Sequence, residues 1–186
     1  MEDAAIIALY WSRSESAIEK TDEKYGGYCR TIAYNILENH EDTEECTNDT
    51  YFKVWNAIPP QRPSLFRAFL GKIARNTALK RYDSSHADKR GGGETAILLS
   101  ELEECVPAPN NAETECESAE LSRAVSDFLY QLDELSRNLF VRRYWYAEKL
   151  TNLCEAYGIS ASQGKSTLYR VRGKLKEYLE KEGFLL

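Results

Sequence analysis

Apolar residues recur at helical spacing through most of the chain, and no sustained alternation of β-branched and polar residues indicates a strand. The spacing predicts a first helix over residues 3–25, which the Gly26-Gly27 pair ends. A second helix is predicted over residues 28–37, before a turn at Asn39-His40-Glu41. The amino-terminal part is therefore expected to be all-α.

The next apolar positions predict a helix that Asp42 caps, with Glu45 as its capping-box partner. This helix stops before Pro59-Pro60, because consecutive prolines cannot continue a helix, and the PPQRP stretch is expected to be a stiff loop. A long basic amphipathic helix follows over residues 64–82. Its inward residues are predicted to be Leu65, Phe69, Ile73 and Leu79, and its outward residues to be Arg67, Lys72, Arg75, Lys80 and Arg81.

Helical periodicity is lost between residues 83 and 118. The glycines at 91–93, the PAPNN stretch and the acidic ETECESAE stretch have the composition of a linker. A short helical piece is expected there over Ala96–Leu102. The fold predicted is all-α, with two small helical domains at residues 1–85 and 119–186 and a flexible linker over residues 86–118.

Helical spacing returns at residue 119, and Asp133 is the candidate N-cap of the second helix of this domain. The stretch LTNLCEAYGISASQGKSTLYRVRGKL then predicts a short helix over residues 150–157, a turn that contains Gly158, and a second helix. A glycine commonly follows the last residue of a helix. Ser160 and Gln163 fit a capping box at the start of the last helix. This order of elements is the helix-turn-helix arrangement.

A solvated basic face is the alternative interpretation of the last helix, but the short helix, glycine turn and cap before it favour DNA binding. Its apolar residues Leu168, Val171 and Leu175 are predicted to pack inward. In a helix-turn-helix the first residues of the second helix approach base edges, and cations further along hold phosphates. The candidate contacts with base edges are Gln163, Lys165, Ser166 and Tyr169, and the candidate phosphate contacts are Arg170, Arg172 and Lys174.

Charge is distributed unevenly along the chain. The whole sequence carries 24 Lys plus Arg and 30 Asp plus Glu, a net charge of −6. Residues 62–90 nevertheless have a net charge of +6, and residues 162–186 of +3. Attraction to a polyanion depends on the face presented to it and not on the total charge. The two basic segments therefore predict two separate contacts with nucleic acid.

Other features exclude several classes of protein. No apolar run approaches the roughly 18 residues that span a membrane, and the acidic N-terminus lacks the basic start of a secretory signal. We therefore expect a cytoplasmic protein with no membrane partner. The five cysteines are scattered, no Cys-x-x-Cys occurs, and the two histidines, His40 and His86, lie far from any cysteine cluster. This pattern predicts reduced, packed thiols and neither a metal nor another cofactor.

Four stretches of the sequence carry a resemblance to a known family: HEDTEECTNDTYFKVWNAIPP, RPSLFRAFLGKIARNTALKRY, LFVRRYWY and GISASQGKSTLYRVRGKL. Together they resemble bacterial RNA polymerase sigma factors of the small, two-domain extracytoplasmic-function (ECF) group. The helix by which such factors engage the minus-ten element of a promoter is matched by RPSLFRAFLGKIARNTALKRY. The preceding helix, which docks on core RNA polymerase, is matched by HEDTEECTNDTYFKVWNAIPP. The domain that reads the minus-thirty-five element is matched by LFVRRYWY and GISASQGKSTLYRVRGKL.

The resemblance implies roles for individual residues. Polymerase docking would use Asp42, Glu45, Asp49, Phe52 and Trp55, although Trp55 can equally be a core residue. The loop at residues 59–64 would capture a base unstacked from the melted strand. The path of that strand would be lined by Arg62, Ser64, Arg67, Lys72, Arg75, Asn76 and Arg81, and a solvated or acid-paired side chain is the alternative for each of them.

Three residues depart from the family pattern. Lys80 stands where the family often has Asp, Gly164 where the recognition helix often has Val, and Thr167 where Arg is common. Glycine inside a helix costs about 1 kcal/mol relative to alanine. Gly164 and Thr167 therefore bear on the promoter preference of the second domain and its affinity for DNA.

The resemblance predicts a sigma factor that binds core RNA polymerase and promoter DNA and directs promoter recognition, promoter melting and transcription initiation. An anti-sigma protein is a plausible further partner. A stand-alone helix-turn-helix transcriptional regulator is the first alternative, but it leaves the basic segment at 62–90 unexplained. An enzyme acting on nucleic acid is the second, but the sequence lacks a metal-ligand cluster, a phosphate-binding glycine loop and a His or Cys nucleophile constellation. The protein is therefore not expected to be an enzyme.

Overall fold

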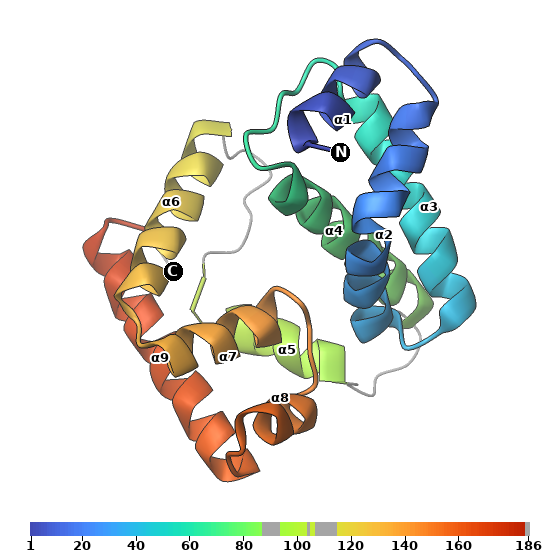
Figure 1. The fold of residues 1–186 in the computed structure, drawn as a ribbon. Coiled ribbons are helices and arrows are strands. Elements are labelled where there is room, and N and C mark those ends of the chain that lie inside the picture. Colours follow the sequence, from blue (N-terminus) through green and yellow to red (C-terminus); the bar gives the residue numbers. More distant parts are fainter. Residues whose placement is uncertain (87–93, 104, 107–114, 185–186) are drawn as a thin grey trace. The chain divides into compact units, whose positions relative to one another are not determined.

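The computed structural model describes residues 1–86, 94–103, 105–106 and 115–184, and their regular structure is entirely helical (Figure 1). The chain separates into two compact units, Met1–Gly91 and Gly92–Leu186. The predicted all-α class with a carboxy-terminal helix-turn-helix is confirmed. The predicted functional domain bounds stay a prediction.

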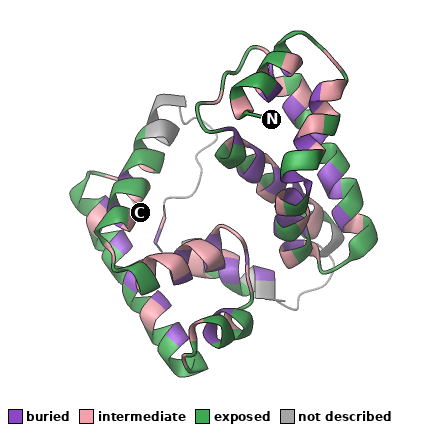
Figure 2. Ribbon diagram, in the orientation of Figure 1, coloured by how far each residue is buried: buried purple, intermediate pink, exposed green. Residues whose placement is uncertain are grey.

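The first unit contains four helices, α1 (Asp3–Trp11), α2 (Ser16–Leu37), α3 (His40–Ala57) and α4 (Phe66–His86). Helices α2, α3 and α4 pack against one another, and α1 packs on α2. Figure 2 shows buried residues along the length of α2, α3 and α4. The largest side chains that are almost fully buried here are Tyr10, Ile32, Ile36, Phe66 and Leu70.

The predicted single helix over residues 3–25 is wrong. Helix α1 ends at Trp11, where Arg13 takes a positive φ of 54°, and α2 continues through Gly26 and Gly27. Gly26 is buried beneath an ion pair between Asp22 and Arg30, whose carboxylate and guanidinium lie 3.0 Å apart. A Cβ at position 26 would meet both of those side chains. Glycine is therefore used here for close packing and does not break the helix.

The predicted cap of α3 is also wrong. The helix begins at His40, and the Asn39 side chain accepts a hydrogen bond of 3.0 Å from the backbone N–H of Asp42. The carboxylate of Asp42 is instead paired with Arg81 of α4. Asn39, three residues before the predicted cap Asp42, can take this role because asparagine is as effective as aspartate at the N-cap of a helix.

The buried face of α4 lies one position away from the prediction. Phe66, Leu70, Ala74 and Ala78 are buried, whereas Leu65 precedes the helix and is 71% exposed. The predicted inward residues Phe69, Ile73 and Leu79 are only half-buried. The buried row contains small residues that let α2 and α3 approach closely, and apolar size alone does not identify such a face.

The second unit contains α5 (Glu94–Glu103), α6 (Glu115–Gln131), α7 (Glu134–Tyr144), α8 (Leu150–Tyr157) and α9 (Ala161–Lys181). Helix α9 packs on α6, α7 and α8, and α5 packs on α7. The helical piece expected over Ala96–Leu102 is thus present as α5. The rest of the predicted linker includes residues 87–93, 104 and 107–114, which lie outside the described residues.

The predicted helix ends of the second unit are confirmed. The Asp133 carboxylate accepts a hydrogen bond of 2.9 Å from the backbone N–H of Ser136, and this bond lowers the pKa of Asp133. Gly158 follows α8 with a φ of 63°. Ser160 and Gln163 form the reciprocal capping box at the start of α9. These bonds join residues three positions apart, so the local sequence is enough to specify them.

The predicted packing of reduced thiols is confirmed for the cysteines whose side chains are described. Cys29, Cys46, Cys105 and Cys154 are buried, and Cys29, Cys46 and Cys154 are free thiols. Burial raises the pKa of the Cys29 thiol to about 12 and that of Cys46 to about 11. Within the described ranges, no three His, Cys, Asp or Glu side chains gather as a metal ion would require. No described helix is both long enough and apolar enough to cross a membrane.

Candidate nucleic-acid and partner interfaces

The predicted DNA contact Arg81 is paired with carboxylates of the predicted docking helix. Its guanidinium lies 3.1 Å from Asp42, within hydrogen-bonding distance of Glu45 and 3.9 Å from Asp49. The hydrogen bond to Glu45 raises the pKa of Arg81. The structure therefore joins a residue predicted to bind DNA with three residues predicted to bind polymerase.

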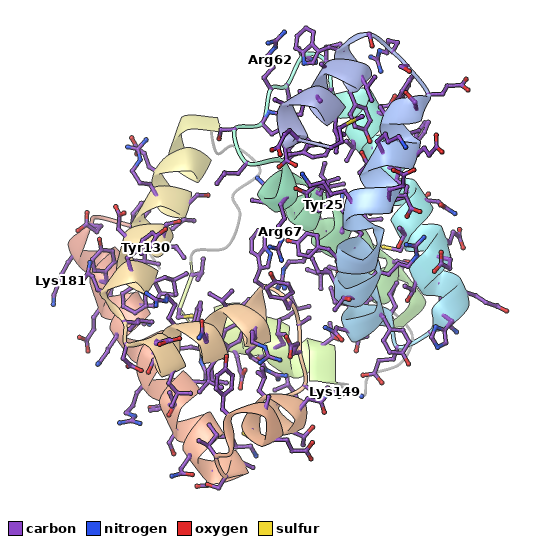
Figure 3. The ribbon with its side chains drawn as sticks, viewed as in Figure 1. Tyr25, Arg62, Arg67, Tyr130, Lys149 and Lys181 are labelled. Atoms are coloured by element: carbon purple, nitrogen blue, oxygen red, sulfur yellow. The ribbon has the colours of Figure 1, made fainter. Side chains whose placement is uncertain are left out.

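The other predicted strand contacts on α4 and directly before it differ in their exposure. Ser64, Arg67, Lys72 and Asn76 are exposed. The Arg67 guanidinium lies 4.8 Å from the ring centre of Tyr28 in α2, and Figure 3 labels Arg67 beside that helix. Arg75 is only partly exposed, and its burial lowers the pKa of the guanidinium to about 10. Arg75 is consequently the least accessible cation of this group for a phosphate.

The loop before α4 carries Arg62, which is exposed at the end of α1 (Figure 3). Its guanidinium lies 4.2 Å from the ring centre of Trp11, the last residue of α1. This distance is that of a cation–π contact. Trp11 was not predicted as a site residue, because a single helix was expected over residues 3–25. Within such a helix, Trp11 would be one more apolar position of the amphipathic pattern.

The two aromatic residues predicted to dock on the polymerase have different environments. Phe52 is 66% exposed on α3. Trp55 is half-buried, its ring centre lies 6.1 Å from that of Tyr10, and its carbonyl oxygen accepts a hydrogen bond of 2.6 Å from Arg13. Phe52 is thus available to a partner, whereas much of Trp55 belongs to the packing of the first unit.

The start of α9 presents a polar face. Lys165, Ser166, Tyr169 and Arg170 are all exposed, and Leu168, Val171 and Leu175 are buried as predicted. Gln163 is exposed as well, but its side-chain oxygen accepts a hydrogen bond of 2.9 Å from the backbone N–H of Ser160. The side-chain amide of Gln163 therefore already takes part in the cap of α9, and a contact with a base would have to use the same amide.

Arg172 was expected on the outside of α9, and that position is wrong, whereas its role in binding DNA stays a prediction. Its side chain is only 11% exposed and donates a hydrogen bond of 2.7 Å to the hydroxyl of Tyr144. The same guanidinium lies 3.5 Å from the carboxylate of Glu101 in α5. Tyr144 also donates to Glu101 at 2.9 Å, and burial raises the pKa of Tyr144. Arg172 thus connects three helices of the second unit.

Comparison with known families identifies part of the first unit. Residues 22–87 match the Sigma-70 region 2 family. These residues form a sigma-70 region 2 domain. The predicted resemblance to bacterial sigma factors is thereby confirmed. The region 2 domain includes α3, α4 and most of α2, whereas α1 precedes it.

The chain is also similar to a solved structure of CnrH in complex with the cytosolic domain of CnrY. The identity is 20%, the match covers 97% of this chain and 99% of that one, and the TM-score is 0.44. At this TM-score the likeness carries no functional inference. No curated protein matches the chain with significance.

The region 2 domain contains all of the residues predicted to bind polymerase and the predicted strand contacts from Arg62 to Arg81. The match supports their assignment to one functional unit, and their individual roles stay predictions. The predicted contacts on α9 lie outside the matched segment, so the role of the helix-turn-helix also stays a prediction.

Proposed function

We propose that this protein is a sigma factor of the ECF type, which binds core RNA polymerase and directs it to promoters. The observation that carries the proposal is the sigma-70 region 2 domain at residues 22–87. Within it, α3 offers exposed carboxylates and the exposed Phe52 to a partner, and the loop before α4 offers Arg62. The proposed role is binding rather than catalysis, in the cytoplasm, where polymerase and promoter DNA occur.

The two units would act together. Helix α3 docks on core polymerase, the loop at residues 59–64 and α4 hold the unpaired strand of the minus-ten element, and α9 binds the minus-thirty-five element. Phosphate contacts weaken steeply with salt, so neither unit alone is expected to hold a promoter tightly. Once one unit is bound on the polymerase, the contact of the other becomes intramolecular and gains effective concentration. Binding of the unpaired strand lowers the free energy of the open complex.

The test is in vitro transcription with purified core polymerase, followed by mapping of the start sites. We expect the protein to associate with core polymerase and to direct initiation at defined positions. Failure of both would contradict the proposal. Specific duplex binding in the absence of polymerase would favour the stand-alone helix-turn-helix regulator instead. An anti-sigma protein is a further proposed partner, since the family resemblance implies one.

We expect Arg170→Ala to weaken binding to the upstream promoter element by about fivefold to tenfold, as loss of one charged contact of roughly 1 kcal/mol implies. Arg170 is exposed, and among the described residues its side chain donates hydrogen bonds only to Ser166 and Thr167 of its own helix, at 3.3 and 3.4 Å. Its removal should therefore leave the unfolding temperature unchanged. The affinity is measured by fluorescence anisotropy of labelled promoter DNA with the polymerase complex.

Arg172→Ala is the matched control, because it removes the same type of side chain two positions along the helix. Arg172→Ala removes the hydrogen bond to Tyr144 and the ion pair with Glu101, so we expect a lower unfolding temperature. Equal DNA affinity for Arg170→Ala and the unsubstituted protein would contradict the role given to Arg170.

A further inference from the structure

The end of α1 carries an aromatic and cationic cluster, formed by Trp11, Arg13, Trp55 and Arg62. Trp11 and Arg13 precede the segment that matches region 2. Arg62 lies over the Trp11 ring at 4.2 Å, and Arg13 lies over the Trp55 ring at 5.3 Å. Trp11 still has 37% of its surface exposed. Two arginine–tryptophan pairs therefore lie at the end of α1, where Trp11 and Arg13 are two residues apart.

Among the residues that the structure describes, neither Arg13 nor Arg62 forms an ion pair with a carboxylate. Arg30 pairs with Asp22 and Glu44, and Arg81 pairs with three acidic residues of α3. In the part of the chain that the structure describes, Arg13 and Arg62 instead contact only aromatic rings and a backbone carbonyl. Residues 1–61 contain 12 acidic side chains and only 5 basic ones. The lack of an ion pair to these two arginines within the described residues is therefore not explained by a shortage of acidic side chains.

These side chains fit a ligand that is both flat and anionic. An indole ring stacks on a nucleobase, and arginine adds cation–π contact and attraction to the phosphate. A base within duplex DNA is already stacked between its neighbours and cannot reach an indole. An unpaired nucleotide can. Arg62 also belongs to the loop proposed to hold the melted strand, so a strand that leaves this loop passes the end of α1.

We propose that Trp11, Arg13 and Arg62 form a binding site for an unpaired nucleotide of promoter DNA, with the base on Trp11 and its phosphate near the two guanidinium groups. The site extends the path of the melted strand beyond region 2 onto α1. It rests on the proposed function for the identity of the strand. Its geometry rests on the contacts within the first unit alone.

The test compares Trp11→Leu with Trp11→Tyr in the full chain. Leucine keeps an apolar side chain but offers no ring, whereas tyrosine keeps a ring for stacking. Base–aromatic stacking contributes about 1–3 kcal/mol per base, so we expect Trp11→Leu to weaken binding by about tenfold and Trp11→Tyr to retain most of it. Anisotropy is measured with the polymerase complex on forked promoter DNA, and with the full chain alone on a short single-stranded oligonucleotide.

Two controls separate stacking from a merely structural role. Tyr34→Ala removes another exposed aromatic side chain, at the far end of α2, where the ring centre of Tyr34 lies 4.9 Å from that of His40. This substitution should leave both affinities unchanged. A fully paired duplex that carries only the minus-thirty-five element, and so is not melted, should bind Trp11→Leu as tightly as the unsubstituted protein, because such a duplex presents no base to Trp11. Loss of duplex binding in the same proportion as forked binding would overturn the proposal.

The outcomes also separate this site from the proposed function. If the protein directs initiation but Trp11→Leu binds forked and single-stranded DNA normally, the site is wrong and the sigma factor proposal stands. If the protein does not associate with core polymerase, the nucleotide site is tested only by the affinity of the full chain for the single-stranded oligonucleotide. A tenfold loss there keeps the nucleotide site, and an unchanged affinity overturns it.

Discussion

Replacing Gly164 with valine is expected to destabilise the helix-turn-helix by about 3 kcal/mol, the upper part of the range for overpacking a core. Gly164 is buried in the first turn of α9, where it faces α8. A Cβ at this position would lie 2.6 Å from the Sγ of Cys154 and 3.1 Å from the Cδ1 of Leu150. Valine adds two further methyl groups to this contact. The glycine therefore allows α8 and α9 to approach closely, which explains its presence where the family often has valine.

Hydrogen exchange followed by mass spectrometry measures this effect, because it reports the amides of α8 and α9 separately from those of the first unit. We expect faster exchange in both helices for Gly164→Val. Gly173→Ala is the matched control, since Gly173 lies in the same helix and a Cβ there has no neighbour within 4 Å. Alanine at this site should stabilise α9 by up to about 1 kcal/mol.

A double substitution identifies the clash. Cys154→Ala removes the sulfur that a Cβ at position 164 would meet. Gly164→Ala should therefore destabilise α9 less in the Cys154→Ala background than in the unsubstituted protein. An equal effect in both backgrounds would show that Cys154 is not the obstacle, and normal exchange in Gly164→Val would contradict the packing argument as a whole.

Phe52→Ala is expected to weaken binding to core RNA polymerase by about 30-fold, which corresponds to the roughly 2 kcal/mol of an interface hot spot. Phe52 is 66% exposed beside the carboxylates of α3, so its ring is available to a partner. Little of it is buried within the protein, and we expect the unfolding temperature to stay unchanged. Affinity is measured by titrating core polymerase into the fluorescently labelled protein.

Trp55→Ala provides the contrast. Its ring packs near Tyr10 and beneath the Arg13 guanidinium, so its removal should lower the unfolding temperature of the first unit. Tyr130→Ala, an exposed aromatic of α6 labelled in Figure 3, is the control for loss of an aromatic side chain outside α3. Unchanged polymerase affinity for Phe52→Ala would move the docking contact away from this part of α3.

Exposure within the first unit could not be predicted from periodicity alone. Trp11 was hidden in an expected continuous helix, yet α1 ends there and the residue contacts Arg62, which is far from it in sequence. The predicted break at Gly26-Gly27 failed because tertiary contacts offset a glycine cost of about 1 kcal/mol per residue. The buried row of α4 was displaced by one position because Ala74 and Ala78 bury little apolar area and so contribute weakly to a hydrophobic pattern.

The all-α class, the two basic segments, and the cap and turn of the helix-turn-helix could be predicted from the amino-acid sequence, because they depend on composition or on bonds between residues a few positions apart. Only the tertiary structure decided which cations remain accessible. Arg81 meets Asp42 at a separation of 39 residues, and Arg172 meets Glu101 of another helix. Such pairs form because helix packing brings distant charges within a few ångströms, where their attraction exceeds that of solvent-separated charges. No local pattern contains that information.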